Sequence, residues 1–421
     1  MQHAQARRNR GVSQFFWVSY GISMTLTATE IELTQAAAAA PMLAQVEQWA
    51  AINTGTRNLR GLRQMAGILA DAFATLPGEI ALVKAPPVES VAADGKVSEI
   101  EHGDHIQLRV RPDAPIQMLF TGHMDTVFSV DHSFQTQKWL EPGILNGPGV
   151  ADMKGGIAVM LAALSAIDHP DFGYEVVINS DEETGSASSA ALIARAAKGK
   201  LAAFTYEPSA LPDGTLAGAR AGSGNFSIIF TGKSAHAGRN PDEGRNALVA
   251  AADLAVRLKA ASRKGFSCNP ARIEGGGPNN VVPDHAVLRV NFRPKTPADE
   301  MIARALLDTL ATEIARSHDV RVHVHGSFGR PPKPIDTDAL KLFTLVKQCG
   351  AELGQSISWR DTGGVCDGNN IAACGVPVVD TMGVCGGSIH SADEFMIAAS
   401  LGERAALSAL TISRIISKGH L

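Results

Sequence analysis

Short apolar runs that each stop at an acidic or imidazole side chain are the feature that most constrains this chain. The runs end at His123, at Glu182 and Glu183, and at Glu207, and His390 follows another such run closely. Runs of this length, bounded by Gly, Pro and Asp, are typical of buried parallel strands. In open α/β sheets, ligands bind in the crevice beyond the carboxyl ends of the strands. We therefore expect these side chains to meet at one edge of a sheet, where only a cation would hold so many charges together.

Asp152 precedes a stretch whose apolar residues recur with helical spacing. Ile157, Met160, Leu161 and Leu164 follow the i, i+3, i+4, i+7 pattern of a helix that packs on a core. A carboxylate at this position can be a simple N-cap, and each strand-end group can be an ordinary turn or loop residue. All of these ordinary roles together, in this order, are less probable than one shared site. The set therefore predicts a metal-dependent hydrolase.

The residue types fit a two-metal hydrolase. Such enzymes hold two ions roughly 3.5–4 Å apart, often on a bridging carboxylate. Zinc lowers the pKa of its water to about 7, and a free carboxylate nearby can act as general base. The adjacent Glu182 and Glu183 leave an extended backbone in different directions, so one can bind metal while the other faces substrate. Asp125 is the nearest candidate to fix the second ring nitrogen of His123.

The order of the expected elements indicates an α/β fold with more than one domain. At 421 residues the chain exceeds the usual size of a single core. Helices are expected over 31–51, 58–76, the stretch after Asp152, and 188–197, with strand-like segments over 79–92, 105–111 and 116–121. This alternation is typical of βαβ units and a mostly parallel sheet.

The pattern changes near Gly222. The following residues read as strand, helix, two strands, helix and strand, which is the order of a ferredoxin-like unit. The expected elements lie at 226–230, 246–263, 271–275, 285–292, 298–317 and 320–325. We therefore expect a catalytic domain in two parts, 24–220 and 332–421, interrupted by an inserted domain over 221–331.

Charge and cysteine content exclude several classes of protein. A net charge of −4 and a pI near 6.4 give no basic footprint for nucleic acid. Five cysteines without a C-x-x-C pair argue against a disulfide framework and against a cysteine zinc site, which favours a cytoplasmic protein. No later run approaches the roughly 20 apolar residues that span a bilayer.

The N-terminal residues 1–23 combine arginines with an interrupted apolar stretch. We expect a disordered extension or a start assigned too early, with Met24 as the true first residue. A periplasmic signal peptide is the alternative, although polar residues interrupt the apolar region that it needs.

A set of motifs, taken in order, resembles one family of co-catalytic zinc metallopeptidases and amidases. The motifs are TGHMDTVF, GVADMKGG, SDEETGS, YEPSA, KSAHAGRNPDEGRNAL, PNNVVPDHA, DTGGVCDG and IHSADEF. The family includes carboxypeptidase G, acetylornithine deacetylase, succinyl-diaminopimelate desuccinylase and aminoacylase. The resemblance extends from about residue 40 to the C-terminus, and the ordered set is more specific than any one motif.

The resemblance implies two zinc ions per subunit, with cobalt or manganese as substitutes. The implied metal ligands are His123, Asp152, Glu183, Glu207 and His390. Asp152 would bridge the ions, with His123 and Glu207 on one and Glu183 and His390 on the other. Glu182 would deprotonate water and pass the proton to the leaving amine, with Asp125 supporting the site as a further catalytic residue. The Asp152–Met153 peptide is expected to be cis.

The resemblance also implies that the inserted domain joins two subunits into a homodimer. His236, in SAHAG, would reach the partner's site and stabilise the oxyanion of the tetrahedral intermediate. Asn280, Arg293 and Arg330 would hold the substrate carboxylate or line its pocket, a task that suits the bidentate fork of arginine.

The loop DTGGVCDG would present backbone N–H groups of Gly363 and Gly364 to the same carboxylate. It departs from the more usual T-G-G-[ST]-D of the family, because Val365 and Cys366 precede Asp367. The departure affects the part of the site that sets specificity.

The sequence thus predicts a zinc hydrolase of small peptides or N-acyl amino acids. Carboxypeptidase G-like release of a C-terminal amino acid is the leading activity, and deacylation of an N-acyl amino acid is the runner-up. A one-metal or non-zinc enzyme is a further alternative, because mixed carboxylate and imidazole sites select zinc weakly. The remaining alternative is a non-catalytic binding protein on the same fold. Such a protein should lack the general base or one of the metal ligands, and this sequence keeps all of these residues.

Overall fold

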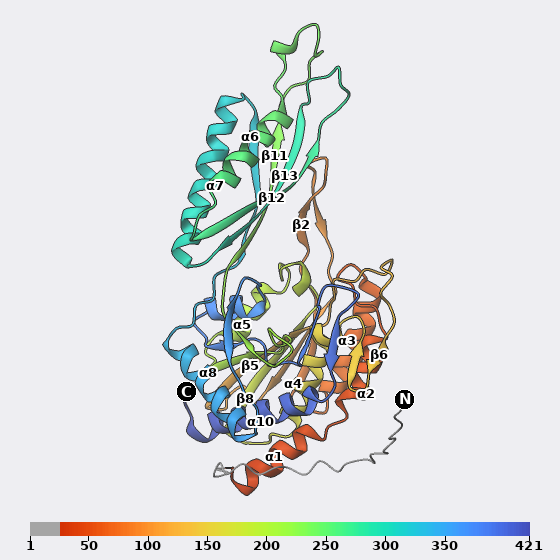
Figure 1. Ribbon diagram of the computed structural model, residues 1–421, viewed down its shortest axis with the longest axis vertical. Coiled ribbons are helices and arrows are strands. Elements are labelled where there is room, and N and C mark those ends of the chain that lie inside the picture. Colours follow the sequence, from red (N-terminus) through yellow and green to blue (C-terminus); the bar gives the residue numbers. More distant parts are fainter. Residues whose placement is uncertain (1–25) are drawn as a thin grey trace, which may run out of the picture.

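The computed structural model describes residues 26–421, so the expectations for residues 1–23 lie outside the described part of the chain. Two units are apparent, each with its own sheet and its own apolar core (Figure 1). The main domain contains the elements up to β10 and from α8 onward. The inserted domain contains the elements from β11 to β14.

A six-stranded sheet forms the centre of the main domain, in the order β1-β4-β8-β5-β9-β16. The strands are β1 (Glu79–Val83), β4 (His105–Val110), β8 (Phe172–Asn179), β5 (Ile116–His123), β9 (Ala202–Thr205) and β16 (Val378–Val379). β8, β5, β9 and β16 are parallel neighbours, whereas β4 pairs antiparallel with both β1 and β8. The carboxyl ends of four strands therefore lie at one edge, as expected for a mixed α/β sheet.

Helices cover both faces of this sheet, which explains why its strands are continuous apolar runs. Alternate residues of β5 face opposite sides: Phe120 packs into the core with α4 (Gly156–Ser165) and α10 (Ser400–Lys418). Leu119 packs into the second cluster, with α5 (Ala190–Ala197) and α9 (Asp367–Ala373). Both side chains are fully buried.

Two expected elements were wrong because proline interrupts them. The helix expected over 31–51 is two helices, α1 (Ala28–Ala38) and α2 (Met42–Ala50), with Pro41 between them. Proline lacks the N–H that a continuing helix needs. The strand expected over 79–92 ends at Val83 and resumes after Pro86 and Pro87 as β2 (Val88–Val91). The helix expected over 58–76 is α3 (Leu59–Phe73).

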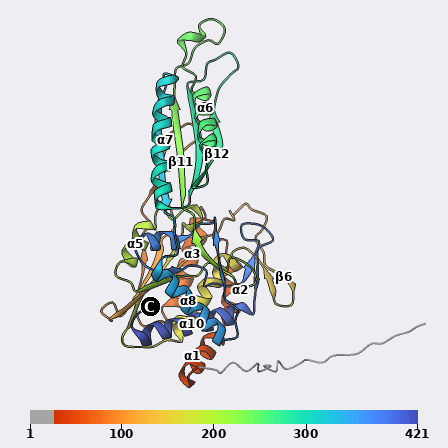
Figure 2. The ribbon, with the colours of Figure 1, turned by 60° about the vertical axis from the view of Figure 1, so that its left-hand side comes forward.

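The inserted domain has the strand and helix order expected of a ferredoxin-like unit. Its elements are β11 (Ser223–Thr231), α6 (Ala247–Ala260), β12 (Phe266–Gly275), β13 (His285–Pro294), α7 (Pro297–Ser317) and β14 (Arg321–Arg330). The strands form an antiparallel sheet in the order β12-β13-β11-β14. Phe226, Ile228 and Phe230 pack in one core with residues of α6 and α7. Figure 2 shows both helices running alongside the strands.

Smaller elements complete the main domain. β2 forms a hairpin with β3 (Val97–Ile100). A four-stranded sheet contains β6 (Lys138–Glu141), β7 (Ile144–Asn146), β17 (Gly386–Gly387) and β18 (Phe395–Ile397). β10 (Leu216–Arg220) pairs with β15 (Trp359–Thr362), and the remaining α-helix of the described residues is α8 (Thr337–Glu352). None of the helices in residues 26–421 is long and apolar enough to cross a membrane. The cysteines of this part of the chain are all free.

Candidate metal centre

Asp152 lies between two imidazoles, with one carboxylate oxygen facing each. Its Oδ1 is 3.1 Å from Nε2 of His123, and its Oδ2 is 3.3 Å from Nε2 of His390. Each imidazole also contacts a glutamate: His123 Nε2 is 3.6 Å from Glu207 Oε2, and His390 Nε2 is 3.1 Å from Glu183 Oε2. The five side chains thus form two triads that share one carboxylate, which is the arrangement of a bridged two-metal site.

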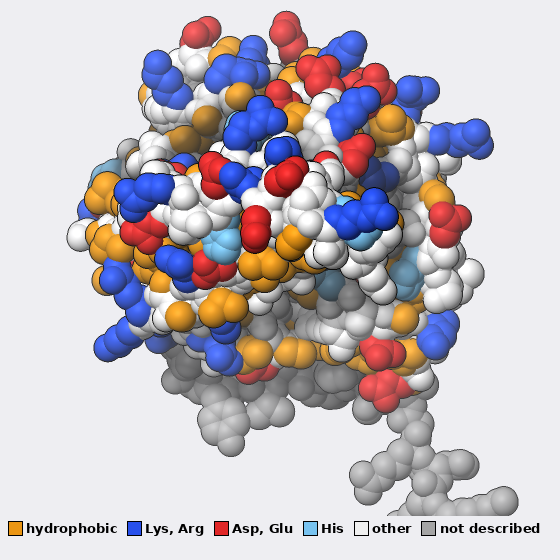
Figure 3. Space-filling model, turned by 90° about the horizontal axis from the view of Figure 1, so that it is seen from above, with side chains coloured by type: hydrophobic (Ala, Val, Ile, Leu, Met, Phe, Trp, Pro, Cys, Tyr) orange, Lys and Arg blue, Asp and Glu red, His pale blue; other side chains and the backbone are white. Residues whose placement is uncertain are grey.

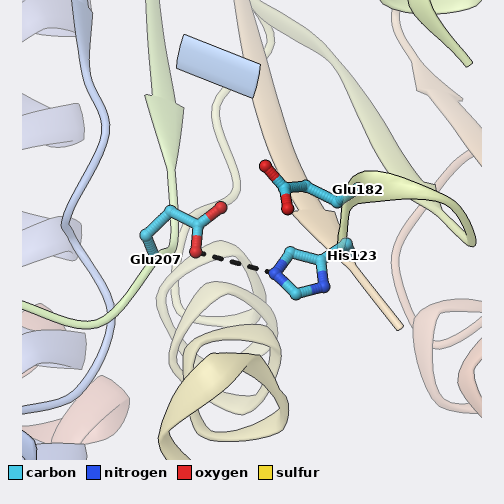
Figure 4. Close-up of side chains that lie close together, drawn as sticks. All are labelled: His123, Glu182 and Glu207. Atoms are coloured by element: carbon cyan, nitrogen blue, oxygen red, sulfur yellow. Dashed lines mark ion pairs between the residues drawn. The ribbon is translucent and has the colours of Figure 1, made fainter. Parts of the chain in front are cut away.

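Glu182 lies beside these triads without contacting either imidazole as an ion pair. Figure 4 shows its carboxylate above His123, across from Glu207. Ligand atoms of these three residues lie within 4.8 Å of one another, so this trio could also hold an ion. We favour the triads that share Asp152, because Glu182 Oε1 already accepts a hydrogen bond from Arg330 at 2.6 Å.

The sheet positions most of these groups. His123 is the last residue of β5, Glu182 and Glu183 follow β8 in a short turn, and Glu207 follows β9. Parallel strands end at the same edge, so these side chains converge. Asp152 comes from the loop before α4, and His390 comes from the loop between β17 and β18.

Asp125 connects the two strand ends from beneath the site. Its Oδ1 accepts a hydrogen bond from the backbone N–H of Glu182 at 3.1 Å. Its Oδ2 accepts one from the backbone N–H of Glu183 at 3.3 Å and another from the Thr56 hydroxyl at 2.7 Å. Nδ1 of His123 lies 3.0 Å from the Asp125 carbonyl oxygen and 3.4 Å from Oδ1. A carbonyl only accepts, so Nδ1 carries the proton and Nε2 is left free for a metal.

Glu394 is a positioning residue that the sequence analysis missed. Its buried carboxylate accepts backbone N–H groups of Gly149 at 3.2 Å, Ala151 at 3.0 Å and Asp152 at 3.0 Å. It therefore holds the loop that presents Asp152. The signal was available, because Glu394 stands in the motif IHSADEF with His390. The Asp152–Met153 peptide is cis, which confirms that expectation.

The electrostatics of the cluster favour a cation. Burial, together with the charge of Asp152, raises the pKa of Glu207 to about 8 and that of Glu183 to about 7. Hydrogen bonds that His390 donates to the carboxylates of Asp152 and Glu183 raise its pKa to about 11. The carboxylate oxygen Oε1 of Glu207 is buried and has no hydrogen-bond partner within the described chain. A divalent ion would provide the missing charge and the missing contact, so the residues fit metal binding.

Arg330 lines the cavity beside the metal centre, and its guanidinium is paired with buried carboxylates. It is 3% exposed, and its Nη2 donates to Glu182 Oε1 at 2.6 Å and to Ser186 Oγ at 2.9 Å. Its Nη1 donates to Asp367 Oδ1 at 2.9 Å. The guanidinium therefore holds the Glu182 carboxylate in place, and Asp367 of the loop DTGGVCDG anchors the guanidinium.

A cavity of about 1230 Å³ opens above the metal centre. Arg293 and Gly364 are among the residues that line it. Arg293 Nη1 donates to the Gly363 carbonyl at 3.5 Å, so this side chain and the glycine turn are in contact. Arg293 has no carboxylate partner among the ion pairs of residues 26–421, and its Nε donates to Asn291 Oδ1 at 2.8 Å.

His236 and Asn280 are not brought to this centre within one chain. They lie in the loops β11–α6 and β12–β13, at the end of the inserted domain distant from the main domain (Figure 1). The two loops contact each other, because the Ala237 N–H donates to the Asn280 carbonyl at 2.9 Å.

Comparison with known proteins agrees with this geometry. Residues 119–414, most of the chain, match the model of peptidase family M20/M25/M40. Carboxypeptidase G2 of Pseudomonas sp. (strain RS-16) is 31% identical over 299 residues, covering 69% of this chain and 71% of that protein. Succinyl-diaminopimelate desuccinylase of Psychrobacter arcticus is 30% identical over 314 residues, covering 68% of this chain and 75% of that protein.

A solved structure also shares the fold. The YXEP protein of Bacillus subtilis, described as a dinuclear metal-binding peptidase of the M20 family, superposes with a TM-score of 0.61 at 14% identity. The match covers 88% of this chain and 97% of that one. The family match and the geometry lead to one conclusion: the chain belongs to peptidase family M20/M25/M40 and is a hydrolase that acts on C–N bonds.

Proposed function

We propose that the protein hydrolyses an amide bond next to a free carboxylate, with carboxypeptidase G-like release of a C-terminal amino acid. The observation that carries the proposal is Asp152 shared between the triads of His123 and His390. We assign two zinc ions to this pair of triads, with cobalt or manganese as substitutes. The relative named carboxypeptidase G2 supports the leading activity.

When bound, the two ions supply Lewis-acid chemistry, polarising the scissile carbonyl and lowering the pKa of water. Glu182 is the general base in this proposal. Arg330 occupies its Oε1, which leaves Oε2 to take a proton from water and deliver it to the leaving amine. Asp125 keeps the Glu182 backbone and the His123 ring in place.

Arg293 and the glycine turn at Gly363 and Gly364 form the proposed carboxylate site. An arginine without a carboxylate partner, facing the cavity, suits an anionic group of the substrate. We retain Arg330 as the residue that orients Glu182 beside this site.

We also propose a homodimer through the inserted domain, in which His236 and Asn280 reach the partner's site. The loops that carry them lie far from their own metal centre (Figure 1). Large apolar side chains are exposed on the helices of this domain: Val249 and Val256 on α6, and Met301 and Ile302 on α7. These side chains offer a surface for a second copy.

A second candidate function is deacylation of an N-acyl amino acid, which is favoured by the desuccinylase relative. The two activities break the same kind of bond and differ in the group that flanks it. Purified protein with added zinc should be assayed on short peptides and on N-acyl amino acids. Turnover of one class identifies the activity, and turnover of neither would favour the remaining alternative, a binding protein.

A further inference from the structure

The β2–β3 hairpin is an insertion between β1 and β4 that the main sheet does not require. β1 and β4 are neighbours in that sheet, and Val83 at the end of β1 is the direct partner of His105 at the start of β4. A turn of about two to five residues would connect such a pair. The chain instead uses residues 84–104, in which β2 and β3 pair antiparallel.

The hairpin is fixed to the inserted domain rather than free in solvent. Figure 1 shows it rising from the main domain beside the strands of the inserted domain. Three contacts hold it there: Arg289 Nη2 donates to the Val91 carbonyl at 2.8 Å, His285 Nε2 donates to the Ala93 carbonyl at 3.2 Å, and His325 Nε2 lies 3.2 Å from Glu89 Oε2. Two of these contacts use backbone carbonyls, so they set the position of the hairpin independently of its side chains.

The same hairpin forms one wall of the cavity above the metal centre. Val88 and Ile100 both line this cavity, and they are a directly opposed cross-strand pair at the base of the hairpin. Both side chains are half-buried, so each presents part of its apolar surface to the cavity. The inserted sheet also lines the cavity and contributes polar groups such as Asn225 and Ser227.

The sheet order indicates which part of a substrate would meet this wall. The hairpin leaves from the β1–β4 side of the sheet, and the metal centre follows at the ends of β8, β5 and β9. The glycine turn lies on the other side: Arg220 donates to the Gly364 carbonyl at 3.2 Å and to Asp380, directly after β16, at 2.7 Å. A substrate with its carboxylate at the turn and its scissile bond at the metals would extend its acyl group toward the hairpin.

We propose that the β2–β3 hairpin is the acyl-side wall of the active site, and that Val88 and Ile100 select substrates with an extended apolar acyl group. The inference rests on the proposed function, because it assumes a substrate carboxylate at the glycine turn. The class of substrate is an N-acyl amino acid whose acyl group is aliphatic or aromatic and longer than acetyl.

The test compares N-acetyl, N-hexanoyl and N-benzoyl derivatives of one amino acid, using the wild-type protein and the double variant Val88→Ser/Ile100→Ser. The ratio of kcat/KM for the hexanoyl and benzoyl substrates over the acetyl substrate should fall about tenfold, the order expected for a changed apolar contact. Val97→Ser is the matched control, because Val97 belongs to the same hairpin, is 38% exposed and does not line the cavity. The ratio for Val97→Ser should stay within about twofold of the wild-type ratio, which corresponds to a difference of under about 1 kcal/mol in activation free energy.

A second variant removes the wall as a whole, with residues 84–104 replaced by Asn-Gly to join Val83 to His105. It should lose the preference for long acyl groups to the same extent. If wild type hydrolyses the series but the double variant keeps its ratio, the inference about the hairpin is overturned and the proposed function stands. If wild type hydrolyses no member of the series and no peptide, the proposed function fails and the inference fails with it.

Discussion

Glu182 and Glu183 are neighbours in the chain but have different partners in the structure. Glu183 contacts His390 at the metal centre, whereas Glu182 is held by Arg330. Successive side chains leave the backbone in different directions, and Asp125 fixes both backbone N–H groups. This geometry separates a residue that would hold metal from one that would move a proton.

The separation can be tested with a matched pair of variants. Glu182→Gln should retain both metal ions and lower kcat by at least about 100-fold, because the amide cannot accept a proton. Glu183→Gln should lose metal, because the amide removes a charged ligand. Metal content by mass spectrometry and steady-state kinetics check both. Normal kcat in Glu182→Gln would mean that the base is another residue.

Metal binding should release protons near neutral pH. Without ions, the pKa of His390 is about 11 and that of Glu207 is about 8, so both groups hold a proton at pH 7. A cation binds the deprotonated forms, so protons leave as it enters, and affinity rises with pH. Calorimetry of zinc binding at pH 7, in buffers of different ionisation enthalpy, measures the number released. Proton uptake would contradict this account.

Arg330 should contribute more to stability than Arg293. Arg330→Ala leaves the buried carboxylates of Glu182 and Asp367 without their cation, which should cost about 3–5 kcal/mol in the free energy of unfolding. Arg293→Ala removes no ion pair and should cost about 1 kcal/mol or less. Urea unfolding of both variants provides the comparison. Equal effects would show that the Arg330 network is unimportant for the fold.

At the scale of elements, the sequence predicted those strands whose position is specified by a continuous run of apolar residues. β5, β8 and β9 are buried on both faces, so they read as continuous apolar runs and their ends could be located. Half of the residues of the hairpin strands β2 and β3 are exposed, and these strands have no such pattern. Their position depends on contacts with residues of the inserted domain, about 200 positions away, such as Arg289.

The candidate site, like the fold, could be predicted from the sequence only in part. Residues at strand ends could be grouped because parallel strands share an edge, and the structure brings these side chains together. Glu394 stands in the motif IHSADEF, but its contacts with the backbone of the Asp152 loop could not be read from that motif, and no local pattern encodes the contact of Asp380 with Arg220. The placement of Arg330 on Glu182 likewise follows from how the inserted domain meets the main domain.

One glycine limits how the strand end that carries Glu207 can be rearranged. A Cβ at Gly383 would lie 2.2 Å from the Tyr206 carbonyl oxygen and 2.7 Å from that of Glu207. Gly383→Ala should therefore displace Glu207 and reduce metal content and Tm. Gly67→Ala is the control, because Gly67 is within α3 and has open space. It should stabilise the protein by about 0.5–1 kcal/mol. Full metal content in Gly383→Ala would contradict this prediction.

At the scale of the whole molecule, the elongated inserted domain separates the loops that carry His236 and Asn280 from the metal centre of the same chain. Figure 3 views the molecule from the end where these loops lie, and basic and acidic side chains are interspersed over that face. This charge pattern offers no basic field for nucleic acid.

Complementation between subunits tests the proposed homodimer. Glu182→Gln and His236→Ala homodimers should each have little activity. Mixed dimers, formed by co-expression with different tags, should regain about half the wild-type activity. The His236→Ala subunit keeps Glu182 and receives an intact His236 from its partner, so that its site is complete. Mixed dimers as inactive as the parents would place His236 outside the partner's site.

The central claim is that two divalent ions lie on either side of Asp152. Crystals of protein purified with zinc, measured at the zinc absorption edge, test it most directly. We predict two anomalous peaks, one between His123 and Glu207 and the other between His390 and Glu183, with an oxygen of Asp152 on each. No peak at these side chains, or peaks at other residues, would contradict the account.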